Sequence, residues 1–264
     1  LIFGNPGGGK SWSLVALGGY AVRLGYNVIH YTLELGEDYI GKRYDSFFTK
    51  IPVTKIDSFK SKVEEVIPQL PGKLVIKEFP TGRATMSTIE SHINKCTNMG
   101  VKPDLVVIDY VDLLSGKRKT RERKDEIDDI YSSAKGLARQ LSIPIWSVSQ
   151  VNRAGAQDKI IEGDKAAGSY DKMMISDFAM SLSRKKEDKV NGTGRFHIMK
   201  NRYGMDGLTF SVSADTSTGH FEVFDYRDSE EETLAPKTAS NKFDTDVDNY
   251  DKQMLWKKLK EFKK

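Results

Sequence analysis

The first chemically informative segment is a glycine-rich octapeptide near the N-terminus. Residues 4–11 read Gly-Asn-Pro-Gly-Gly-Gly-Lys-Ser, which satisfies the spacing G-x-x-x-x-G-K-[ST] of a phosphate-binding loop. Glycines let successive backbone N–H groups face a phosphate, where a side chain would block the approach. We expect Lys10 to reach the β- and γ-phosphates of a nucleotide and Ser11 to bind Mg²⁺. The expected contacts comprise the loop and the residue after it: Gly4, Asn5, Pro6, Gly7, Gly8, Gly9, Lys10, Ser11 and Trp12. The alternative is a glycine-rich turn without a ligand.

Two carboxylates and one amide follow apolar runs and suit phosphate hydrolysis. Asp109 ends the run 105–108, and Mg²⁺ needs negative charge at the carboxyl edge of such a sheet, although an aspartate there can also cap the next turn. Glu34 closes an earlier run, next to the phosphate loop, and could orient or deprotonate water, but a surface glutamate would look identical. Gln150 could sense the γ-phosphate, and an ordinary turn amide fits equally well.

A sheet must bring these strand ends together, and the hydrophobic pattern predicts one. Helices are expected at residues 10–24, 37–48, 58–69, 87–98 and 122–141, and strands at 27–33, 73–78, 105–108 and 143–148. Because helices and strands alternate, these strands should be parallel. Four later runs, at 178–183, 195–199, 208–213 and 221–224, predict a meander of consecutive strands. The expected fold is therefore α/β, a P-loop sheet that is mainly parallel, with antiparallel strands added at its C-terminal end.

The composition narrows the class of protein. The chain has 264 residues, 41 Lys and Arg against 37 Asp and Glu, and 38% hydrophobic residues, so it is not disordered throughout. It contains no run of about 18 apolar residues that would span a membrane. Its single cysteine, Cys96, cannot form an internal disulfide, and the four histidines lack metal-ligand spacing. We expect a cytoplasmic protein without a membrane partner or structural zinc.

The charge pattern separates the C-terminal end from the rest. We expect residues 1–224 to form one ATPase domain, residues 225–251 an acidic linker of net charge −6, and residues 252–264 a short basic amphipathic helix of net charge +5. This tail fits both a solvated extension and a docking peptide. The sequence starts at Leu1, without a methionine, and only the last three residues of the strand expected before the phosphate loop, residues 1–3, are present. We therefore expect a fragment of a longer protein.

Several motifs occur together in one order. They are the phosphate loop, Tyr31-Thr32-Leu33-Glu34-Leu35 with Arg43 downstream, Val107-Ile108-Asp109-Tyr110, Ser147-Val148-Ser149-Gln150-Val151-Asn152-Arg153, and Met199-Lys200-Asn201-Arg202-Tyr203-Gly204. Over residues 1–224 the chain resembles the RecA-like ATPase domain of DnaB-like replicative helicases, and looks most like the members from T-even-type bacteriophages. The phosphate loop alone is generic, whereas the ordered set, above all Lys-x-Arg-x-Gly, is specific.

This resemblance implies a function and roles. It implies a homo-hexameric ring that binds ATP between neighbouring domains, hydrolyses it, and moves 5′ to 3′ along single-stranded DNA. Glu34 matches the catalytic glutamate, Asp109 the Mg²⁺-associated aspartate, and Gln150 the residue that couples nucleotide state to the DNA loop. Lys200 and Arg202 match the pair that reaches into the neighbour's site, where a guanidinium offsets charge on the γ-phosphoryl group. From residue chemistry alone, this pair also fits a solvated strand end.

Two segments are candidates for DNA contact. In the family, a loop after the glutamine motif lines the pore, and here it includes Lys165, Gly168 and Ser169. Bacterial members often carry an arginine–glutamate pair near this lysine, and this sequence does not. The basic run Lys117, Arg118 and Lys119 is a second candidate, although such runs are often solvated helix starts. Both would bind the DNA backbone rather than read bases.

Two other functions share most of these features. A RecA-like recombinase or signalling ATPase would have the same fold and loop, but would form a filament or act on protein. A nucleotide-binding subunit without turnover would need fewer of the catalytic residues. The Lys200-x-Arg202-x-Gly204 spacing favours the helicase. A primase or helicase loader is a candidate partner of the tail.

Overall fold

The computed structural model describes residues 1–116, 123–151, 160–161 and 170–226. The segment Leu1–Tyr226 forms one compact unit. No helix among the described residues is long and apolar enough to cross a membrane. The predicted acidic linker beyond residue 226 and the predicted basic helix lie outside the described residues.

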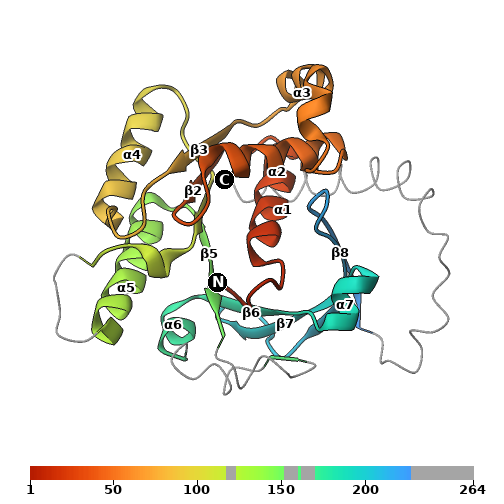
Figure 1. Cartoon of the computed structure of the whole chain (residues 1–264). Helices are drawn as coiled ribbons and strands as arrows, with labels where there is room; N and C mark the ends of the chain where they lie inside the picture. The colour runs from red at the N-terminus through yellow and green to blue at the C-terminus, as the bar shows by residue number, and fades with distance from the viewer. Residues whose placement is uncertain (117–122, 152–159, 162–169, 227–264) are drawn as a thin grey trace. The chain divides into compact units, whose positions relative to one another are not determined.

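Nine strands of the described residues form one sheet, in the order β3-β2-β4-β5-β1-β6-β7-β8-β9 (Figure 1). The first six strands in this order pair in parallel, and the pairs from β6 to β9 are antiparallel. This confirms the predicted fold class. The strands are β1 (Ile2–Gly4), β2 (Val28–Thr32), β3 (Leu74–Glu78), β4 (Leu105–Asp109), β5 (Ile145–Gln150), β6 (Phe178–Ser183), β7 (Thr193–Asn201), β8 (Thr209–Asp215) and β9 (His220–Asp225).

Three details differ from the sequence prediction. β6 begins the expected meander, because it pairs antiparallel with β7, but it also pairs in parallel with β1 and follows an unpredicted short helix, α6 (Tyr170–Ile175). A second short helix, α7 (Lys186–Asn191), separates β6 from β7. With six residues each, these helices are too short to show an apolar period. The strand before Glu34 is also not beside β1, because β4 and β5 lie between β2 and β1.

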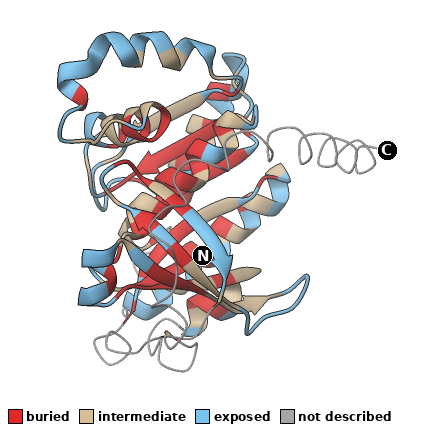
Figure 2. Cartoon of the chain, turned by 90° about the vertical axis from the view of Figure 1, so that its right-hand side faces the viewer, coloured by how far each residue is buried: buried red, intermediate tan, exposed pale blue. Residues whose placement is uncertain are grey.

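Helices cover both faces of the parallel part of the sheet. They are α1 (Lys10–Arg23), α2 (Glu37–Thr49), α3 (Lys60–Val66), α4 (Met86–Asn98) and α5 (Arg123–Leu141). Side chains of successive strand residues point to opposite faces. Accordingly Leu105 and Val107 pack with α1 and α2, whereas Val106 and Ile108 pack with α4 and α5. Figure 2 shows the resulting buried sheet between more exposed helices.

Local sequence explains where some helices begin and how closely they pack. Thr85 caps α4, because its hydroxyl accepts from the backbone N–H of Thr88 and the Thr88 side chain accepts from the backbone of Thr85. On α1, a Cβ atom at Gly18 would overlap Tyr44 of α2, and one at Gly19 would overlap Phe47. The two glycines therefore let α1 and α2 approach closely behind the phosphate loop.

Candidate nucleotide-binding site

The glycine-rich loop connects β1 to α1 and depends on its glycines. Gly7 and Gly9 have positive φ angles of 63° and 93°, which other residues rarely adopt. The Gly8 N–H donates to the Asn5 carbonyl at 3.0 Å, and a Cβ atom on Gly8 would lie 2.9 Å from that oxygen. The Lys10 ammonium donates to two carbonyls at the start of the loop, at 2.9 and 3.0 Å. The loop therefore has the tight turn and close backbone approach that phosphate binding requires.

A pocket of about 450 Å³ opens beside this loop, where the parallel strands end. It brings together most of the residues predicted from the sequence. Those that line it are Pro6, Gly7, Gly8, Gly9, Lys10, Ser11, Trp12, Glu34, Asp109 and Gln150. Gly4 and Asn5 do not line it, and their carbonyls instead hold the Lys10 side chain. The sequence-predicted loop, both carboxylates and the amide thus share one cavity.

Asp109 is the most buried acidic residue of the pocket. It is 1% exposed, and neither of its carboxylate oxygens has a hydrogen-bond partner of good geometry among the described residues. Burial raises the pKa of Asp109, and the neighbouring Ser11 hydroxyl opposes this increase. A buried carboxylate without a partner is costly unless a cation or bound water compensates for it. The pair Ser11 and Asp109 therefore fits a hydrated Mg²⁺ ion, which prefers hydroxyl and carboxylate oxygens.

Glu34 reaches the pocket from the turn between β2 and α2. Its side chain is exposed. Two short hydrogen bonds hold the surrounding turn: the Thr32 hydroxyl donates to the Leu35 carbonyl and the Thr81 hydroxyl donates to the Leu33 carbonyl, both at 2.6 Å. Although β4 and β5 separate β2 from β1, this turn places Glu34 at the edge of the pocket.

Three cationic side chains that the sequence analysis did not assign to the pocket also line it. Arg184 and Lys189 follow β6, and Arg43 comes from α2. The Arg43 guanidinium lies 4.7 Å from the ring centroid of Trp12 and 5.4 Å from that of Tyr39, in cation–π contacts. Arg43 belongs to one of the ordered motifs, whereas nothing in the local sequence around Arg184 or Lys189 predicts that these residues lie at the pocket.

The lining side chains make the pocket positive. Among the described residues that line it, four cations (Lys10, Arg43, Arg184 and Lys189) face two carboxylates (Glu34 and Asp109). Burial lowers the pKa of Lys10, the two carboxylates oppose this change, and the charge of Lys189 reinforces it. This excess of positive charge suits an anionic ligand.

Lys200 and Arg202 do not line this pocket. They lie where β7 ends, and the pairing of Phe178 with Asn201 puts this end beside the start of β6. The phosphate loop adjoins the other end of β6, where Gly4 pairs with Leu182. Six residues of β6 span roughly 20 Å. The pair and the phosphate loop of one chain are therefore at opposite edges of the sheet.

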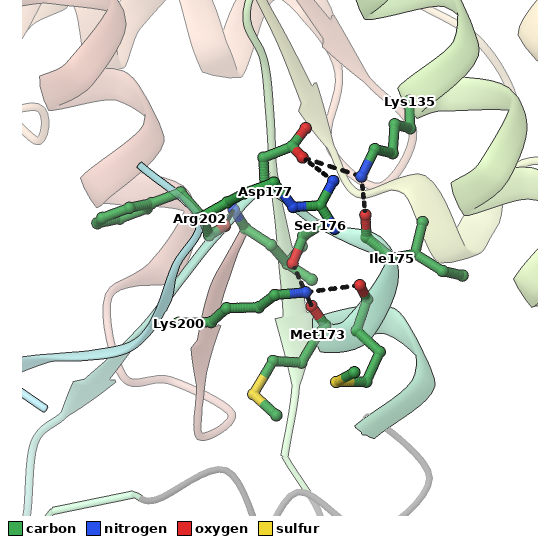
Figure 3. Close-up of polar contacts among 10 residues, drawn as sticks. Lys135, Met173, Ile175, Ser176, Asp177, Lys200 and Arg202 are labelled. Atoms are coloured by element: carbon green, nitrogen blue, oxygen red, sulfur yellow. Dashed lines mark hydrogen bonds and ion pairs between the residues drawn. The ribbon is translucent and has the colours of Figure 1, made fainter. Parts of the chain in front are cut away.

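At their own edge, both side chains are held by neighbours (Figure 3). The Lys200 ammonium donates to the Met173 and Met174 carbonyls at 3.1 and 2.6 Å, at the end of α6. Burial lowers the pKa of Lys200, as do the nearby charges of Arg202 and Lys135. The Arg202 guanidinium forms an ion pair with Asp177. The predicted DNA-contact residues Lys165, Gly168, Ser169, Lys117, Arg118 and Lys119 lie outside the described residues.

Comparison with known protein families identifies the family of the chain. Residues 1–222 match the family described as the DnaB-like helicase C terminal domain. The chain belongs to this family. The resemblance inferred from the ordered motifs is thereby confirmed.

Individual helicases are similar to parts of this DnaB-like domain. The DnaB-like replicative helicase of Enterobacteria phage T4 is 23% identical over 208 residues, which cover 74% of this chain and 44% of that protein. The replicative DNA helicase DnaB of Helicobacter pylori is 36% identical over 69 residues, which cover 26% of this chain and 14% of that protein. The chain thus spans less than half the length of the curated relatives it matches.

Solved structures share the fold of this DnaB-like domain. A structure described as an ATPase domain aligns with a TM-score of 0.72 at 22% identity, covering 86% of this chain and 84% of that one. A DnaB-like replicative helicase, described together with its interactions with primase, also has a TM-score of 0.72 at 21% identity, covering 86% of this chain and 58% of that one. At these identities the likeness concerns the fold.

Proposed function

We propose that this DnaB-like domain is the ATP-hydrolysing motor of a replicative DNA helicase. It works as a homo-hexameric ring that moves 5′ to 3′ along single-stranded DNA and unwinds the duplex. The observation that carries the proposal is the shared pocket of the phosphate loop, Glu34, Asp109 and Gln150, in a chain of this family. Its positive lining and unpartnered buried carboxylate are what a site for a metal-bound nucleoside triphosphate needs.

The residues of the pocket divide the work of ATP hydrolysis. The loop N–H groups and Lys10 bind the phosphates and orient the terminal one. Mg²⁺, when bound, supplies positive charge to the phosphate oxygens, and Ser11 and Asp109 would hold it. Glu34, exposed at the edge of the pocket, orients the attacking water and accepts its proton. Gln150, the last residue of β5, contacts the γ-phosphate. It couples the presence or absence of this phosphate to the DNA-contacting segment that follows in the chain.

A second subunit completes each site. Because Lys200 and Arg202 lie at the opposite edge of the sheet from their own phosphate loop, we assign them to the site of a neighbouring subunit. A guanidinium supplied in this way offsets negative charge on the γ-phosphoryl group as the bond breaks. Hydrolysis then depends on assembly, since one subunit alone lacks these charges.

The proposal extends to DNA and protein partners. Lys165, Gly168 and Ser169, together with Lys117, Arg118 and Lys119, would contact the DNA backbone. Primase interaction is described for one structural relative, and we propose a primase or a helicase loader as the partner of residues 227–264. The protein acts in the cytoplasm, which is that of the host cell if a phage encodes it.

Steady-state ATP hydrolysis by the intact protein tests the proposal. Turnover per subunit should rise with protein concentration, because sites form at interfaces, and rise again with single-stranded DNA. Turnover that depends on neither would indicate a self-contained site and contradict the helicase motor. Growth of a filament on DNA, seen by electron microscopy, would favour a RecA-like recombinase instead.

A further inference from the structure

The short helix α7 is fixed to the sheet by one buried carboxylate. Asp188 is 8% exposed, and its Oδ2 accepts from the Lys185 backbone N–H at 2.7 Å, which caps the start of the helix. The same carboxylate forms an ion pair with Arg195 of β7 at 3.1 Å and accepts from the Thr193 hydroxyl at 3.2 Å. The backbone at residue 188 therefore has little freedom to move relative to β7.

Lys189, the next residue, extends from this fixed point to the phosphate loop. Its ammonium lies 3.5 Å from the position that a Cβ atom on Gly7 would occupy, and its side chain lines the nucleotide pocket. Lys189 is exposed, and within the described part of the chain its ammonium has no acidic partner. The backbone of Lys189 is thus held in place beside the phosphate loop, while its ammonium group is accessible to a ligand.

The ammonium groups of Lys10 and Lys189 lie beside the same loop, where a bound anion would stabilise both. Lys10 and Lys189 repel each other, as the effect of Lys189 on the pKa of Lys10 indicates. A bound triphosphate would offset this repulsion, because it presents several negative oxygens to the same cavity.

We propose that Lys189 is a phosphate-binding residue, which contacts the phosphate chain of the bound nucleoside triphosphate from the same subunit that supplies the phosphate loop. This inference rests on the proposed ATPase function and adds a cation to it. Lys189 differs from Lys200 and Arg202, because it serves its own pocket and acts before any neighbour is present. It strengthens ground-state binding, whereas the trans pair acts on the reacting γ-phosphoryl group.

Three variants of the full chain test this role. Lys189→Gln removes the charge, Lys189→Arg keeps it, and Lys186→Gln removes a similar lysine of the same helix that does not line the pocket. Titration with a fluorescent Mg·ATP analogue should show binding about 3- to 10-fold weaker for Lys189→Gln, the range expected for one exposed charge-assisted contact. Lys189→Arg and Lys186→Gln should bind within about twofold of the natural protein.

Two further readouts separate a phosphate contact from structural support. The defect of Lys189→Gln should shrink as salt rises from 50 to 500 mM, because salt screens an exposed charge. Its KM for ATP should increase with little change in kcat, as expected when only ground-state binding is lost.

The outcomes are distinct. Unchanged ATP binding in Lys189→Gln, or an equal loss in Lys186→Gln, would overturn the assignment while leaving the ATPase function intact. If the natural protein itself binds no ATP, the proposed function fails first. Weaker binding confined to Lys189→Gln, with rescue by arginine, supports the phosphate contact.

Discussion

Arg202 forms an ion pair with Asp177, with 2.8 Å between Nη1 and Oδ1, at the edge of the sheet opposite the phosphate loop. Lys135 pairs with the same oxygen at 2.9 Å. Burial alone would raise the pKa of Asp177, but Lys135 and Arg202 together lower it below its usual value. Asp177 therefore stays ionised at neutral pH and orients the exposed guanidinium of Arg202.

Replacing Arg202 tests whether it acts on the neighbouring site. Arg202→Ala should leave ATP binding by a single subunit within about twofold, because the pocket of that subunit is intact. Its assembled turnover should fall about 10³-fold. Increasing fractions of Arg202→Ala mixed with natural protein should poison activity more steeply than dilution does. Lys135→Gln, which removes the other partner of Asp177, is the control and should keep most turnover. A linear response to mixing would contradict the trans role.

Glu34 and Lys10 should separate hydrolysis from binding. Lys10→Ala should abolish ATP binding, because it removes the loop cation. Glu34→Gln should retain binding and lose about 10²- to 10⁴-fold in turnover, the usual contribution of a general base. Glu37→Gln is a matched control three residues later, where the carboxylate forms an exposed ion pair with Lys77. Near-normal turnover of Glu34→Gln, measured by phosphate release, would refute its assignment.

The nucleotide site was largely predictable because its motifs are local. The loop, Asp109 and Gln150 each follow an apolar strand run, and parallel strands put such ends at one edge. Lys189 was not predictable, because it reaches the loop through the pairing of β6 with β1, across about 180 residues of sequence. The parallel pairing of β6 with β1 could not be predicted for a related reason: the helix before β6 has only six residues and shows no apolar period.

The buried charge of Asp109 should lower the free energy of unfolding when no ligand is bound. Its pKa is raised by burial, so its charged form is disfavoured in the folded protein, and the cost appears as pH rises above the unfolded value of 3.8. Asp109→Asn should therefore increase the free energy of unfolding at pH 7 by about 1 kcal/mol or more. Mg·ATP should stabilise the natural protein but barely stabilise the variant. Urea unfolding with and without Mg·ATP measures both effects; a less stable ligand-free variant would contradict the expected cost.

A buried ion pair joins α6 to the segment after β4. The Lys172 ammonium lies 2.5 Å from Asp112 Oδ1 and donates to Ser149 Oγ at 3.0 Å, and Tyr131 donates to Asp112 at 3.2 Å. Lys172→Met alone should destabilise the fold by about 3 kcal/mol, because the largely buried Asp112 loses its cation and keeps only hydroxyl hydrogen bonds. Combining it with Asp112→Leu should recover much of this loss. Urea unfolding of the four proteins completes the double-mutant cycle, and additive losses would mean that the two groups do not interact.

Stability should fall as the pH drops below 6.5, and His30 is a specific cause. This residue is 0% exposed, and its Nδ1 lies 2.9 Å from the Tyr44 hydroxyl. Burial, with a smaller effect of the Arg43 charge, lowers the pKa of His30 from 6.5 to about 3. Below pH 6.5 the unfolded chain therefore binds a proton at His30 that the folded protein does not bind. The free energy of unfolding decreases progressively as the pH falls from 6.5 to about 3.

At pH 5 this proton costs about 2 kcal/mol, since the unfolded pKa lies 1.5 units above that pH. His30→Gln removes the titrating group, so its free energy of unfolding should decline less than that of the natural protein between pH 7 and pH 5. His220, whose pKa burial lowers to about 4, contributes equally to both proteins and cancels from the difference. Urea unfolding at half-unit pH steps gives the two curves. Parallel curves would show that His30 is not the group that titrates.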